Sequence, residues 1–208
     1  MPARIAVLGA HGTGKTRLCE DLAGHLRARG HRVAVVPEPL PCADEALALA
    51  KQHERRIDEA ERAADLVIAD TTALQMAAWA PLSPLNVFAQ ERQHGYALTL
   101  LMGLDLPDGR DLPPQDRPAR EQMDTRLRDA LTAAGLGWRV IYGQGPERAR
   151  QALDAVGAVL PWAWEAAACV QDIGRWARLR AQCEKCGDAS CEHRVLAGAF
   201  RRLTAPPT

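Results

Sequence analysis

The sequence has no net charge, because its 208 residues contain 26 Lys and Arg and 26 Asp and Glu. A zero balance excludes the globally basic surface that is typical of a non-specific nucleic-acid-binding protein, although it allows a local basic patch. No apolar run approaches the roughly 18 to 20 residues that a membrane-spanning helix needs. The N-terminal residues lack the basic, apolar and cleavage regions of a signal peptide. We therefore expect a cytoplasmic protein that makes no membrane contact.

Internal repeats and low-complexity segments are also absent. The hydrophobic share of 47% and the charged share of 25% are close to globular averages, so the chain can bury a core. Residues 169–208 hold 7 basic and 4 acidic side chains and four of the six cysteines. We place a boundary near Pro161, which gives a main domain over residues 1–160 and a tail over residues 161–208.

Short apolar runs predict buried strands over residues 5–8, 33–36, 66–69, 96–102 and 140–142. Helical patterns lie between and after them, over residues 15–29, 43–64 and about 123–134, and after Pro146. Such alternation of apolar strands with helices is typical of a parallel sheet covered on both faces. The predicted fold class is therefore α/β, with three layers, of which a five-stranded parallel sheet is the middle one. Such sheets bind ligands beyond the carboxyl ends of their strands.

A phosphate-binding loop follows the first predicted strand. Residues 9–16 read Gly-Ala-His-Gly-Thr-Gly-Lys-Thr, which matches G-x-x-x-x-G-K-[ST] between a strand and a helix. Glycines let several backbone N–H groups point at one anion, and the helix adds its positive N-terminal end. Lys15 is placed to reach the β- and γ-phosphates, and Thr16 to offer its hydroxyl to Mg²⁺. The residues that we expect to bind the nucleotide are Gly9, His11, Gly12, Thr13, Gly14, Lys15 and Thr16.

Carboxylates follow two further predicted strands. Asp70 ends the third strand, where a carboxylate can hold Mg²⁺. Alternatively Asp70 caps the next helix, as Thr71 or Thr72 could. Glu38 ends the second strand, where it could accept a proton from a substrate hydroxyl, or it is a solvated loop residue.

A long polar stretch covers residues 105–121 and is rich in proline, glycine and charge. Such a stretch is typical of an active-site lid, although a solvated loop would have the same composition. In a lid, Arg117 and Arg120 could neutralise the charge that develops on a transferred phosphoryl group.

The residues described so far resemble a family, the kinase-like P-loop proteins related to the nicotinamide riboside kinase domain of NadR-type proteins. The resemblance covers about residues 3–158, and the stretches that carry it are 4–16, 36–39, 69–74, 96–101, 105–107 and 120–121. It implies ATP binding and phosphoryl transfer to a nucleoside hydroxyl. By position it implies that Lys15 and Thr16 serve phosphate and Mg²⁺, Asp70 the metal or the attacking hydroxyl, and Glu38 the substrate side. The chain departs from the family in a shorter segment after Glu38 and in the residues that follow Pro107.

The tail contains a metal-binding pattern. Three thiolates and an imidazole at C-x2-C-x4-C-x-H spacing can form a closed tetrahedral site for structural zinc, and these residues are Cys183, Cys186, Cys191 and His193. Cys169 could replace the histidine as the fourth ligand. Surface thiols or a redox pair of Cys183 and Cys186 are the alternatives without zinc. A helix is expected before this cluster.

The sequence thus predicts an ATP-dependent enzyme, a small-molecule kinase that transfers the γ-phosphate of Mg·ATP to a nucleoside-like hydroxyl. The alternative is a nucleotide-dependent ATPase switch whose zinc tail binds a protein or nucleic acid, and the basic excess of the tail favours it. No Asn-Lys-x-Asp motif occurs, which counts against a GTPase.

Overall fold

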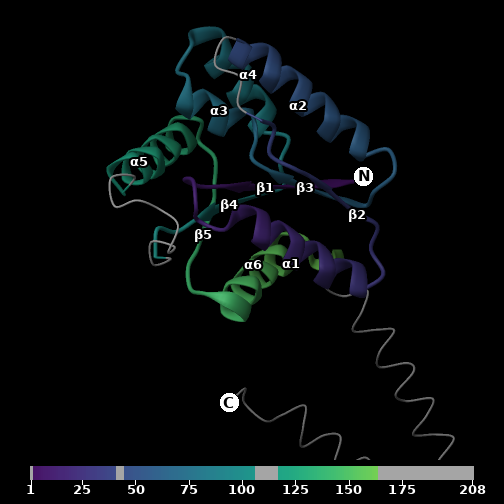
Figure 1. The fold of residues 1–208 in the computed structure, drawn as a ribbon. Coiled ribbons are helices and arrows are strands. Elements are labelled where there is room, and N and C mark those ends of the chain that lie inside the picture. Colours follow the sequence, from purple (N-terminus) through teal and green to yellow (C-terminus); the bar gives the residue numbers. More distant parts are fainter. Residues whose placement is uncertain (1, 41–44, 106–116, 164–208) are drawn as a thin grey trace, which may run out of the picture. The chain divides into compact units, whose positions relative to one another are not determined.

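The computed structural model describes residues 2–40, 45–105 and 117–163, which form a parallel sheet between two layers of helices (Figure 1). The strands are β1 (Ala3–Leu8), β2 (Val33–Val36), β3 (Leu66–Asp70), β4 (Leu98–Met102) and β5 (Arg139–Ile141). The helices are α1 (Lys15–Ala28), α2 (Ala46–Ala60), α3 (Ala73–Trp79), α4 (Ser83–Gln93), α5 (Arg117–Ala133) and α6 (Gly145–Val159). None of these helices is long and apolar enough to cross a membrane.

The sheet has the strand order β2-β3-β1-β4-β5, and every neighbouring pair is parallel. All strands therefore end at the same edge. Because β1 lies between β3 and β4, the loop that follows β1 starts at the centre of that edge. This arrangement confirms the predicted α/β fold with a five-stranded parallel sheet.

Both faces of the sheet are buried. Along β1, Ile5 and Val7 belong to one core cluster, whereas Ala6 and Leu8 belong to the other. The first cluster includes side chains of α1 and α6, and the second includes side chains of α2, α3, α4 and α5. Figure 1 shows these two groups of helices on opposite sides of the sheet. Burial on both faces explains why the strands are apolar at successive positions.

The five expected strands are all present, each within two residues of its predicted bounds. Helices α3 and α4, which lie between β3 and β4, are not predicted by the sequence pattern. Pro81 and Pro84 interrupt this stretch, and α3 spans only 7 residues, too few for a clear helical period. Pro84 in fact lies in the first turn of α4, where its missing N–H does no harm.

Two helix bounds differ from the prediction. The structure places the end of α2 at Ala60, and the following residues form a turn, so the helix is shorter than expected. Helix α5 starts at Arg117, so the end of the predicted polar loop is helical. Pro118 suits this first turn. The tail from residue 164 onward lies outside the described residues, together with its expected helix.

Candidate active site

The phosphate loop connects the end of β1 to the start of α1. Gly14, the N-cap of α1, has a φ of 79°, a left-handed conformation that glycine adopts without steric cost. A Cβ on Gly9 would lie 2.8 Å from Met102 Cβ and 2.9 Å from Thr13 Oγ1, so a side chain there would clash. The expected glycines therefore stand where this backbone path needs them.

The base of the loop is fixed, and its tip is open. The Thr13 hydroxyl, which is fully buried, donates to the Ala10 carbonyl at 2.8 Å. His11 and Gly12 are exposed, so they form the part of the loop that a ligand or solvent can reach.

Lys15 lies between two oxygen atoms at the edge of the sheet. Its Nζ is 3.5 Å from the Ala10 carbonyl and 3.6 Å from Glu38 Oε2. The lysine side chain is 7% exposed and the Glu38 side chain 39%. The structure thus brings Glu38 to the phosphate loop, with one face of its carboxylate open to solvent.

Asp70 and Thr16 meet beside Lys15. Strand β3 pairs with β1 in a register that sets Asp70 opposite Val7, and the Thr16 hydroxyl donates to Asp70 Oδ2 at 2.6 Å. The other oxygen, Oδ1, is buried without a hydrogen-bond partner among the described residues. Burial raises the pKa of Asp70, while the Thr16 hydroxyl and the Lys15 charge act in the opposite direction.

This pair of oxygen groups fits Mg²⁺. The ion prefers hard oxygen ligands and is bound in phosphate-transfer sites by one or two carboxylates together with substrate phosphates. Asp70 supplies a carboxylate with one unpartnered oxygen, and Thr16 supplies a hydroxyl. In the described ranges, no group of three or more His, Cys, Asp and Glu side chains could hold a metal by itself. The site fits an ion that shares its coordination with a nucleotide.

Asp70 does not cap the helix that follows it. The N-cap of α3 is Thr72, whose Oγ1 accepts from the Leu74 N–H at 3.2 Å. The same hydroxyl donates to Gln93 Oε1 at 2.7 Å. Of the residues expected as alternative caps, Thr72 caps α3, and the Asp70 carboxylate instead accepts from Thr16.

Two residues that no sequence pattern marked hold the turn after β3, and one of them, Gln75, also contacts the phosphate loop. Gln75 on α3 accepts from the Gly9 N–H at 2.9 Å and donates to Thr71 Oγ1 at 3.2 Å. His53 on α2 contacts the Thr71 carbonyl through Nε2 at 3.1 Å. Both side chains are almost completely buried. Such contacts between distant segments leave no local signal in a sequence.

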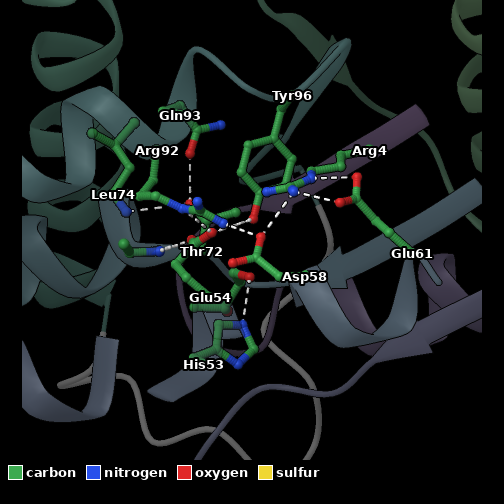
Figure 2. A network of polar contacts seen from close by, with 12 residues as sticks. Arg4, His53, Glu54, Asp58, Glu61, Thr72, Leu74, Arg92, Gln93 and Tyr96 are labelled. Atoms are coloured by element: carbon green, nitrogen blue, oxygen red, sulfur yellow. Dashed lines mark hydrogen bonds and ion pairs between the residues drawn. The ribbon is translucent and has the colours of Figure 1, made fainter. Parts of the chain in front are cut away.

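A buried ionic network supports the same turn from the side of α2 (Figure 2). Glu54, which is 2% exposed, accepts from the Ala73 N–H at 3.1 Å and from Arg92 Nε at 3.2 Å. The Tyr96 hydroxyl donates to Glu54 Oε2 at 3.2 Å, and Arg92 also pairs with Asp58. Figure 2 shows these side chains gathered beside Thr72. The network anchors α2, α3 and α4 to one another behind the site.

Arg4 extends the network to β1. Its guanidinium donates to Glu61 at 2.6 Å and 2.5 Å and to Asp58 at 2.8 Å. These carboxylates raise the pKa of the already basic Arg4. The pairing fixes the C-terminal end of α2 against the sheet.

Another residue that the sequence analysis did not identify, Arg148, contacts the phosphate loop from the side of α6. Arg148 on α6 donates to the Thr13 carbonyl at 2.5 Å and to Asp105 Oδ1 at 3.1 Å. Asp105 Oδ2 accepts from the Gly143 N–H at 2.5 Å. Arg148 therefore connects the phosphate loop to the residues that follow β4 and β5.

The two candidate lid arginines have different surroundings. Arg117 is exposed at the first position of α5, 3.4 Å from Glu121. Arg120, one turn later, is 6% exposed. Residues 106–116, the rest of the predicted lid, lie outside the described residues, as do Cys183, Cys186, Cys191 and His193 of the predicted zinc site.

The sequence matches one protein family. A family model described as an AAA domain covers residues 4–148, which is more than half of the chain. A search of curated proteins found no match.

Solved structures share the fold at low sequence identity. The NadR protein in complex with NR is 18% identical with a TM-score of 0.56, over 76% of this chain and 50% of that chain. Thymidylate kinase from Ehrlichia chaffeensis is 14% identical with a TM-score of 0.53, over 74% and 98%. The YorR protein from Bacillus subtilis in complex with phosphorylated GDP is 15% identical with a TM-score of 0.52, over 74% and 95%. The chain therefore spans half the length of the NadR chain, and its described residues have a P-loop kinase-like fold.

Proposed function

The chain belongs to the AAA domain family, and from this premise we propose that it transfers the γ-phosphate of ATP to a hydroxyl group of a small nucleoside-like acceptor. The observation that carries the proposal is the meeting of two carboxylates with the phosphate loop. Asp70 Oδ2 accepts from the Thr16 hydroxyl at 2.6 Å, and Glu38 Oε2 lies 3.6 Å from Lys15 Nζ. One carboxylate is available to hold a cation and the other to act on an acceptor.

The donor side consists of the loop and α1. Backbone N–H groups of residues 9–16 and the positive end of α1 would bind the phosphates, and Lys15 would move from Glu38 toward the β- and γ-phosphates. Thr16 and Asp70 would hold Mg²⁺, which neutralises phosphate charge when it is bound. Arg148 fixes the Thr13 carbonyl, so the loop backbone is set before the nucleotide arrives.

The acceptor side centres on Glu38. Its carboxylate is partly open to solvent, yet it lies next to the ammonium that would bind the γ-phosphate. An acceptor hydroxyl that donates to Glu38 would lie close to the γ-phosphorus atom. Glu38 would take its proton as the new P–O bond forms and the bond from the γ-phosphorus to the bridging oxygen breaks, so that ADP leaves. Asp70 is the second candidate for this proton. Arg117 and Arg120 remain proposed contacts to the transferred group.

A nucleoside-like acceptor is supported by the three structural neighbours. They are NadR in complex with NR, a thymidylate kinase, and YorR in complex with phosphorylated GDP, so ligands or substrates of this chemical kind occur on the same fold. The zinc site of the tail remains a separate proposal that rests on the spacing of its cysteines and histidine.

The test is the release of ADP from Mg·ATP with and without each member of a nucleoside panel. A kinase should release ADP rapidly only with an acceptor, and Lys15→Ala should abolish the reaction. ADP release at one slow rate, whatever nucleoside is added, would favour the alternative of an ATPase switch. Release that persists unchanged in Lys15→Ala would contradict both functions.

A further inference from the structure

We propose that His53 is a positioning residue, whose imidazole holds the turn after β3 and thereby aims the Asp70 carboxylate at the phosphate loop. This inference rests on the proposed function, because it gives His53 a task behind that site. The residue is 1% exposed, lies on α2 and reaches the Thr71 carbonyl at 3.1 Å. Figure 2 shows its ring next to Glu54.

The turn that His53 contacts is strained. Thr71 has a φ of 81°, and no other non-glycine residue in the described ranges has a positive φ. A β-branched residue rarely adopts this conformation, and it persists only where its surroundings fix it. Such strain is concentrated at active sites, ligand clamps and switch regions. The preceding residue is Asp70.

Three elements fix Thr71 in place. Its N–H donates to the Val7 carbonyl of β1 at 3.1 Å, and its hydroxyl accepts from Gln75 of α3 at 3.2 Å. Gln75 in turn accepts from the Gly9 N–H at the start of the phosphate loop. His53 supplies the contact from α2. The carbonyl held by His53 and the loop amide held by Gln75 are therefore parts of one connected set of hydrogen bonds.

The contact determines the state of the ring. A carbonyl oxygen only accepts, so Nε2 must carry the proton and donate. Burial lowers the pKa of His53, so the ring is neutral and Nδ1 bears no proton. Nδ1 is buried without a hydrogen-bond partner in the part of the chain that the structure describes. The charged groups that act on the ring are Glu54, Arg56, Glu38 and Asp70.

These features give His53 a fixed task. A buried ring whose second nitrogen has no partner is poorly suited to pass a proton to a substrate. A neutral donor with one well-defined acceptor is suited to orient a backbone group. Residues that hydrogen-bond directly to a metal ligand change metal affinity by about 10-fold to 100-fold when they are replaced. His53 acts one residue further away, through the Thr71 carbonyl, so the lower end of this range applies.

The experiment measures the affinity for a non-hydrolysable ATP analogue, AMP-PNP, with Mg²⁺ and with EDTA. His53→Leu removes the donor, whereas His53→Gln keeps an amide N–H near the place of Nε2. Ile57→Val, one turn later on α2, trims a fully buried core side chain and serves as the control for stability. If His53→Leu does not fold, His53→Asn takes its place, because its shorter amide does not reach Thr71.

In the parent we expect Mg²⁺ to increase the affinity. His53→Leu should reduce that gain by about 10-fold. The affinity in EDTA should stay nearly unchanged, because backbone amides of the loop provide the metal-free binding. His53→Gln should restore most of the gain, and Ile57→Val should lower Tm and keep the gain.

Four results would overturn the proposal: a parent that does not respond to Mg²⁺, an unchanged gain in His53→Leu, no rescue by Gln, or an equal loss in Ile57→Val. A parent that shows the expected Mg²⁺ effects and phosphorylates no acceptor would contradict the proposed function and leave the role of His53 supported.

Discussion

Replacing Asp70 by Asn should stabilise the metal-free protein and at the same time remove most of its activity. The carboxylate is 1% exposed, and its Oδ1 has no hydrogen-bond partner among the described residues. Only Oδ2 is satisfied, by the Thr16 hydroxyl at 2.6 Å. The nearby ammonium of Lys15 forms an ion pair with Glu38, at 3.6 Å. One oxygen of the Asp70 carboxylate is therefore buried without a partner among the described residues, and this is the oxygen that we propose binds Mg²⁺.

The size of the effect follows from this geometry. A buried polar atom without a partner costs about 1–3 kcal/mol, and a charged one costs more. Asparagine has the same shape and no charge, so part of the penalty remains, and we expect a gain of about 1 kcal/mol. For a chain of this length that gain corresponds to a Tm increase of about 2–4 °C. The kcat of phosphoryl transfer should fall by a factor of about 100 or more, because a fixed charge at the reacting phosphate is lost.

The stability gain depends on pH in a defined direction. Burial raises the pKa of Asp70 above its ordinary value of 3.8, so ionisation is less favourable in the folded than in the unfolded chain. The ionised carboxylate therefore destabilises the fold at pH values above the folded pKa. As the pH falls through that pKa toward 3.8, the carboxyl group takes up a proton and the penalty disappears. The Tm advantage of Asp70→Asn should thus be greatest at pH values above the folded pKa and shrink as the pH falls toward 3.8.

Asp65 provides a matched control at the other end of the same strand. It is paired with Arg32, whose guanidinium donates at 2.7 Å, and this pairing lowers the pKa of Asp65 to about 2. Its charge therefore stabilises the fold above the unfolded pKa, and this contribution is lost as the pH falls through about 2. Asp65→Asn should lower Tm at neutral pH, opposite in sign to Asp70→Asn.

Calorimetry in EDTA at neutral pH and at about pH 4 measures both variants, and a steady-state assay gives kcat. Asp70→Asn with a lower Tm than the parent at neutral pH would refute the argument from burial. An unchanged kcat would refute the proposed role of the carboxylate in holding Mg²⁺.

Four further predictions concern single side chains and the tail. Lys15→Ala should abolish turnover and weaken Mg·ATP binding with little change in Tm, and unchanged titration calorimetry would contradict this. Glu38→Gln should lower kcat by about 100-fold or more with unchanged Mg·ATP affinity, as expected for the loss of a general base, and equal acceptor turnover would rule out that role. Glu54→Ala should destabilise the protein by about 3–5 kcal/mol in urea unfolding, because Arg92 and other donors lose a buried partner, and a loss below about 1 kcal/mol would show that the network is dispensable. Elemental analysis should find one Zn²⁺ per chain, and chelation should leave ATP binding intact. Protein that is purified without added metal and contains no zinc would refute the ligand set Cys183, Cys186, Cys191 and His193.

The strands were predictable because each is a short apolar run that ends near a turn residue. Leu66–Asp70 is an example: four apolar residues precede one carboxylate, and the structure buries all five. Parallel pairing then places the loop after β1 beside Asp70, so the proximity of these two features could be expected from the sequence.

The contacts behind the site could not be predicted. Glu54 and Tyr96 are 42 residues apart, and His53 and Thr71 are 18 residues apart, so no local spacing joins them. The left-handed conformation of Thr71 is also hidden in the sequence, because threonine is not a residue that signals a positive φ. The contact of His53 with Thr71 depends on the packing of α2 against the turn before α3, and α3 is too short to be recognised in the sequence.

Transfer of labelled phosphate tests the central claim most directly. The protein is mixed with Mg²⁺ and ATP labelled at the γ-position, together with each nucleoside of a panel, and the products are separated. The account predicts that one nucleoside class acquires the label in amounts equal to the ADP formed, and that Lys15→Ala gives neither product. ADP formed with all of the label in inorganic phosphate, whichever nucleoside is present, would contradict it.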